Sequence, residues 1–79
     1  MSKINMETLE LFIDRASETR EDDDIQRCCQ AIIHMTNNRE VTAEEFRYLR
    51  DLYMGLPRAI YAHLFQSMTI MILVEEGKL

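Results

Sequence analysis

The stretch PRAIYAHLFQSMTIMILVEE, from Pro57 to Glu76, is the most apolar part of the chain, and the fold can be built outward from it. Pro57 suits the first position of a helix, because its fixed φ matches the helical value and its missing N–H needs no partner there. No glycine or proline follows until Gly77, which is a good stop signal. The sequence therefore predicts a C-terminal helix of about 30 Å.

The apolar residues of this helix are spread over most of its circumference. Five of them share one stripe: Ile60, Leu64, Met68, Met71 and Ile72. Others lie off that stripe: Tyr61, Phe65, Ile70, Leu73 and Val74. A helix that is apolar on most sides is buried on several of them. The purely apolar run from Ile70 to Val74 is much shorter than the roughly 20 residues of a membrane span, so we expect no membrane insertion.

Three shorter helices are predicted before Pro57, because apolar residues recur at helical spacing in three segments. We place them at Met6 to about Ser17, at about Ile25 to Thr36, and at Ala43 to Met54. The residues expected to face inward on the third are Phe46, Leu49, Leu52 and Tyr53. Residues 1–4 are expected to fray, and residues 18–24 (ETREDDD) form an acidic link.

Two local signals mark helix starts. Thr42 and Glu45 have the spacing of a capping box, in which the Thr hydroxyl accepts from the Glu backbone N–H and the Glu carboxylate reaches back. Asp22, Asp23 and Asp24 precede the second helix, where carboxylates cap and complement its positive end.

Composition indicates one small all-α domain of three to four helices covering residues 1–79. The chain has 47% hydrophobic residues but only two Gly and one Pro, which is typical of a helix-rich, loop-poor protein. Its net charge of −5 argues against direct nucleic-acid binding, which needs clustered Lys and Arg. The two cysteines form no disulfide framework and no signal peptide opens the chain, so we expect a cytoplasmic protein.

The sequence contains no catalytic, cofactor or metal signature, and we expect a protein that is not an enzyme. Cys28 and Cys29 are adjacent, whereas zinc ligands come in spaced pairs such as C-x2-C. They are predicted to be buried small apolar residues, although a redox role stays open. His63 and Ser67 share a helix face, but no glycine-rich turn supplies an oxyanion hole.

Two candidate interaction surfaces remain. Arg47, Tyr48, Arg50 and Arg58 could form a partner-binding face, since Arg and Tyr are favoured at interfaces. The alternative is a solvated surface in which Glu44 and Asp51 pair with Arg47.

The second surface lies on the C-terminal helix. Three short helices cover only part of it, so we expect a homodimer, the commonest symmetric assembly, with a dimeric helical bundle built on the uncovered side. The expected interface residues are Tyr61, Phe65, Met68 and Ile72. For the same reason, we expect a charge at Ile72 to unfold or dissociate the protein.

The order of segments also resembles a known family. The segments follow in a fixed order along the chain. They are a helix with Leu11-Phe12, an acidic link, a helix centred on QAIIHM, a turn ending in Val41-Thr42, a helix with Leu49 and Leu52, and an apolar closing helix. This order is similar to that of the YmgB/AriR family, small helical dimeric bacterial proteins tied to biofilm formation and acid stress and compared in fold with Hha-type nucleoid modulators.

The resemblance covers most of residues 9–75 and consists of apolar positions and lengths. The break at residues 55–57 and the paired cysteines have no counterpart in it, and no functional residue is carried over. It implies a regulatory protein that works through an as yet unidentified protein partner. A mobile-element inhibitor, such as an anti-defence protein or antitoxin that binds a host complex, fits the small size and mild acidity equally well.

Overall fold

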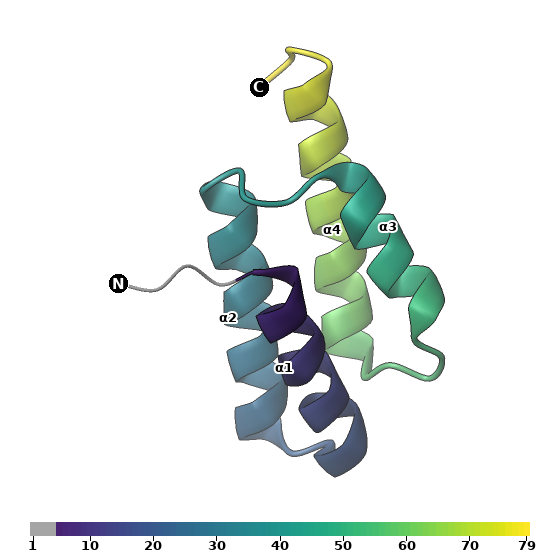
Figure 1. Ribbon diagram of the computed structural model, residues 1–79. Coiled ribbons are helices and arrows are strands. Elements are labelled where there is room, and N and C mark those ends of the chain that lie inside the picture. The colour runs from purple at the N-terminus through teal and green to yellow at the C-terminus, as the bar shows by residue number, and fades with distance from the viewer. Residues whose placement is uncertain (1–4) are drawn as a thin grey trace.

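The computed structural model describes residues 5–79, which form four α-helices (Figure 1). The helices are α1 (Met6–Thr19), α2 (Asp22–Asn37), α3 (Ala43–Leu52) and α4 (Arg58–Glu75). No strand occurs in this part of the chain. The predicted all-α class is therefore confirmed, whereas the predicted fraying of residues 1–4 lies outside the described residues.

Helix α4 lies between α2 and α3, and α1 packs on α2 (Figure 1). Each helix contributes apolar residues at helical spacing to one shared core, because burial of apolar surface is the main favourable term in folding. The largest fully buried side chains come from all four helices: Leu9, Ile13, Cys28, Ile32, Met35, Phe46, Leu49, Ile60 and Leu64. The core therefore draws on all four helices and does not divide the described residues into smaller units.

The first two helices are longer than predicted, so that the acidic link nearly disappears. Helix α1 continues to Thr19 and α2 begins at Asp22, which leaves only Arg20 and Glu21 between them. Arg20 adopts a left-handed conformation (φ 54°), and this single residue turns the chain. Its guanidinium Nη1 donates to the carbonyl of Gly55, 3.0 Å away in the loop after α3. The turn between α1 and α2 is thereby tied to the turn between α3 and α4.

The three aspartates lie in the first turn of α2 and not before it. Glu21 holds the N-cap position and makes no side-chain cap, so the prediction of an aspartate cap is wrong. Asp24 is instead buried against α1, where it accepts from the Thr19 hydroxyl at 2.7 Å and from Arg15 Nε at 3.2 Å. The Thr19 hydrogen bond, with the charge of Arg15, holds the pKa of Asp24 below its usual value.

The start of α3 follows the sequence signal, and its end does not. Thr42 Oγ1 accepts from the backbone N–H of Glu45 at 3.1 Å, and Glu45 Oε1 accepts from that of Thr42 at 2.9 Å, so the capping box is confirmed. The helix ends at Leu52, whose side chain is 50% exposed rather than inward. Tyr53 turns back, and its hydroxyl donates to the Glu10 carbonyl of α1.

The loop between α3 and α4 uses Gly55 and Pro57 for different purposes. Gly55 has a φ of 71°, which an L side chain rarely adopts. Pro57 was predicted as the first residue of α4 but is its N-cap, with a ψ of 141° and a buried ring. The helix therefore begins one residue later, at Arg58.

Candidate functional site

Helix α4 buries one line of side chains and leaves an adjacent line uncovered. The buried residues are Ile60, Leu64, Ser67 and Met71. Next to them lie the four predicted interface residues, which we call the α4 stripe: Tyr61, Phe65, Met68 and Ile72. Tyr61, Phe65 and Ile72 are 48%, 54% and 41% exposed, and Met68 is half-buried.

This arrangement divides the predicted apolar stripe of α4 between a covered line and an uncovered line. Ile60, Leu64, Met68, Met71 and Ile72 were predicted to share one stripe, but in the structure Ser67 takes the inner position and Ile72 is exposed. The reason is geometric, since α2 and α3 both pack on α4 and the line between them contains a serine. Ile72 is therefore exposed within a single chain, and its burial at an interface between chains remains a prediction.

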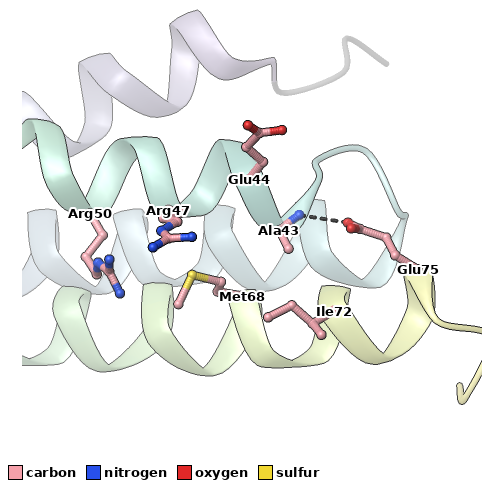
Figure 2. A pocket seen from close by; sticks show the side chains of 7 residues that line it. All are labelled: Ala43, Glu44, Arg47, Arg50, Met68, Ile72 and Glu75. Carbon is pink, nitrogen blue, oxygen red and sulfur yellow. Dashed lines mark hydrogen bonds between the residues drawn. The ribbon is translucent and has the colours of Figure 1, made fainter.

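A groove of about 660 Å³ lies between α3 and α4 beside the α4 stripe. Its lining residues are Ala43, Glu44, Arg47, Arg50, Met68, Ile72 and Glu75. Figure 2 shows the side chains of Arg47 and Arg50 reaching from α3 toward Met68, while Glu44 points away from α4. The groove thus combines an apolar floor with charges of both signs, Arg47 and Arg50 beside Glu44 and Glu75. It brings together residues that the sequence assigned to two separate surfaces.

The two arginines of the groove differ in whether they form an ion pair. Arg50 Nη2 lies 3.0 Å from Asp51 Oδ1 on the same helix. Within residues 5–79, Arg47 pairs with neither Asp51 nor Glu44, so the predicted salt-bridged face is wrong for this residue. Arg47 is exposed and carries its charge free at the edge of the groove.

Glu75 closes one end of the groove by capping α3. Its Oε2 atom accepts from the backbone N–H of Ala43 at 2.8 Å, across 32 positions of sequence (Figure 2). Ala43 is the first residue of α3, where N–H groups lack partners within the helix and the positive end of the dipole favours a carboxylate. Glu75, Glu44 and Ala43 could not be predicted as groove residues from the sequence, because a contact over this separation leaves no local pattern.

The other two predicted partner-binding residues lie outside this groove. Tyr48 is exposed on α3 but does not line it. Arg58 is exposed at the first turn of α4 and forms no ion pair with any described residue. The structure therefore brings together two of the four residues of the predicted partner-binding face.

The cysteines and histidines form no arrangement with evident chemistry. Burial raises the pKa of the Cys28 thiol to about 12 and also raises that of Cys29, so both thiols are held in their unreactive form. A depression of about 200 Å³ between α2 and α4 is lined by His63 and Ser67. The His63 ring bonds to the Ala59 carbonyl at 2.8 Å, and no carboxylate lies among the described residues lining this depression.

Groups of three or more metal-type side chains are absent from the described part of the chain. Within residues 5–79, none of the helices combines the length and apolarity needed to cross a membrane. Comparisons with protein-family models, with curated proteins and with solved structures gave no match for this chain. The α4 stripe and the adjoining groove are therefore the candidate functional site on the strength of their geometry.

Proposed function

We propose that this chain is a small, non-enzymatic regulatory protein that acts through protein–protein contacts. In this proposal two copies associate through the α4 stripe, and the groove arginines bind a further protein partner. The observation that carries the proposal is the uncovered apolar side of α4, where Tyr61, Phe65 and Ile72 stay exposed in a chain of only 79 residues. Contiguous exposed apolar surface of this kind is a mark of interaction sites.

The chemistry of the groove suggests the kind of partner that would bind. Arg47 and Arg50 line the α3 side of the groove, at the edge of the α4 stripe, so a complementary segment would present carboxylates to them. Arginine is enriched at interfaces because its planar group forms paired hydrogen bonds with carboxylates and also packs on apolar surface. An acidic helix meets this requirement.

The biological setting belongs to the same proposal. The resemblance to the YmgB/AriR family favours a bacterial cytoplasmic regulator of biofilm formation or stress response. The second candidate is a mobile-element inhibitor, and the specific observation in its favour is the free Arg47 charge on the α3 side of the groove. Such a surface also suits the capture of an acidic segment on a defence complex or on a toxin.

The first test is the mass of the protein in solution. We expect light scattering at about 100 µM to give twice the 9.4 kDa of one chain, since weak interfaces assemble in the micromolar range. Phe65→Glu should return the mass to that of one chain, because it places a charge in the middle of the stripe. The control Gln30→Glu changes charge at an exposed position of α2 and should leave the mass unchanged.

The second test identifies the partner. Protein captured from bacterial lysate by the native chain is compared with that captured by an Arg47→Glu/Arg50→Glu variant whose helical circular dichroism is unchanged. A nucleoid protein or response regulator lost from the variant supports the regulator, whereas a defence complex or toxin supports the inhibitor. A metabolic enzyme retained equally by both forms would contradict a role for the groove.

A further inference from the structure

The α4 stripe continues into charged residues at both ends with a regular repeat. Positions 58, 61, 65, 68, 72 and 75 alternate steps of three and four, which is the a/d repeat of a coiled-coil seam. Arg58 stands at the first position and Glu75 at the last, with Glu76 beside it. The seam therefore has a positive end, an apolar centre and a negative end.

This polarity discriminates between the two ways in which two copies of α4 can pair. In a parallel pair each position faces its own copy, so Arg58 would face Arg58 of the partner subunit and the glutamates would face each other. In an antiparallel pair Tyr61 faces the partner's Ile72, and Phe65 faces the partner's Met68. The same register brings Arg58 to the partner's Glu75 and Glu76.

We infer that the occupant of the α4 stripe is a second copy of this chain, paired antiparallel, with a reciprocal Arg58–glutamate contact at each end. The inference rests on the proposed function and adds the direction and register of the pairing. Charge complementarity carries it, since opposite charges meet only in the antiparallel arrangement and like charges face each other in the parallel one.

Glu76 is the better acidic partner of the two. Arg58 and Glu76 are 18 positions apart, which is about five helical turns, so both project on the same side of α4. Glu75 lies toward α3, where one of its oxygens already caps Ala43. Within the described chain the carboxylate of Glu76 forms an ion pair only with Lys78, at 3.2 Å, and both side chains are exposed.

A charge swap tests the register, with dimer dissociation constants measured by sedimentation at low salt. We expect Arg58→Glu to weaken the dimer between about two- and thirty-fold, because it removes two exposed ion pairs. Arg58→Glu combined with Glu76→Lys should restore native affinity, since each new charge again meets its opposite. The matched control, Arg27→Glu, makes the same charge change on α2 away from the stripe and should have no effect.

Disulfide formation gives an independent readout. A mixture of R58C chains with E76C chains should yield a cross-linked pair under mild oxidation, whereas R58C chains alone should not. The native cysteines do not interfere, because Cys28 is fully buried and Cys29 nearly so.

The outcomes separate the two proposals. A chain that remains a monomer at all concentrations overturns the dimer and with it this inference. If Phe65→Glu disrupts the dimer but Arg58→Glu tightens it, only the antiparallel register is overturned. The same holds if R58C chains form disulfide-linked pairs by themselves. A dimer that tolerates Phe65→Glu places the interface elsewhere and overturns both.

Discussion

Replacing Glu75 by alanine should destabilise the chain through a helix that Glu75 does not belong to. The carboxylate accepts from Ala43 N at 2.8 Å and lies at the positive end of α3. Loss of a capping acceptor typically costs about 1 kcal/mol, and loss of the favourable charge at a helix start adds about 0.5 kcal/mol. We therefore expect the free energy of unfolding to fall by about 1.5 kcal/mol and Tm by about 6–12 °C.

Urea denaturation followed by circular dichroism measures this change. The protein concentration should be low enough for light scattering to give one chain, since dimer formation would add to the apparent stability. Glu75→Gln keeps an oxygen acceptor and loses only the charge, so it should cost about 0.5 kcal/mol. Glu76→Ala removes the same charge from the neighbouring position without touching α3, and it should stay within about 0.5 kcal/mol of the native chain.

Either of two results would contradict this role of the Glu75 carboxylate. Equal stability of the native chain and Glu75→Ala would mean that the hydrogen bond to Ala43 contributes nothing. Equal losses for the Gln and Ala variants would mean that the acceptor oxygen is irrelevant and that only the charge matters.

Three further predictions follow from burial and from the shifted pKa values. Phe46→Ala should cost about 3–5 kcal/mol because its ring is fully buried, whereas Phe65→Ala should cost the single chain little, and urea midpoints compare them. Iodoacetamide at about pH 8 should leave Cys28 and Cys29 unmodified in the native chain and label both in urea, as mass spectrometry would show; rapid native labelling would contradict their burial. The folded-state pKa of Asp24 lies below the usual 3.8. The ionised carboxylate therefore adds to the free energy of unfolding above that pH, and this stabilisation is lost as the pH falls through the folded pKa. The stability gap between the native chain and Asp24→Asn should therefore narrow below about pH 4, and a gap independent of pH would contradict this.

The helices themselves could be predicted from sequence because their signals are local. Periodic apolar residues, the capping box at Thr42 and the stop at Gly77 each involve neighbours within a few positions, and the structure has helices in all four places. The predicted helix boundaries were wrong where the local sequence is compatible with two structures. The acidic run at Asp22 suits a cap or a first turn equally well, and contacts of Asp24 with α1 decide in favour of the turn.

The exposed side of α4 could be predicted only in part. Apolar residues surround the helix, so hydrophobicity alone does not tell which line is covered. Ser67 is buried because α2 and α3 pack on the sides that flank it, and Ile72 is displaced outward as a result. The groove could not be predicted for a related reason, since Arg47 and Met68 are brought together only by the packing of α3 on α4.

The two long-range hydrogen bonds near the loop after α3 also constrain the order of folding. Arg20 reaches Gly55 over 35 positions and Tyr53 reaches Glu10 over 43, so neither bond can form until α1 and the loop have come together. Before contacts between residues so far apart in sequence can form, the loss of chain entropy on closing the long intervening segment must be offset. The loop should thus be among the last parts to become ordered. In hydrogen exchange, the amides around Gly55 should open together with α1, because detaching that helix releases both anchors at once.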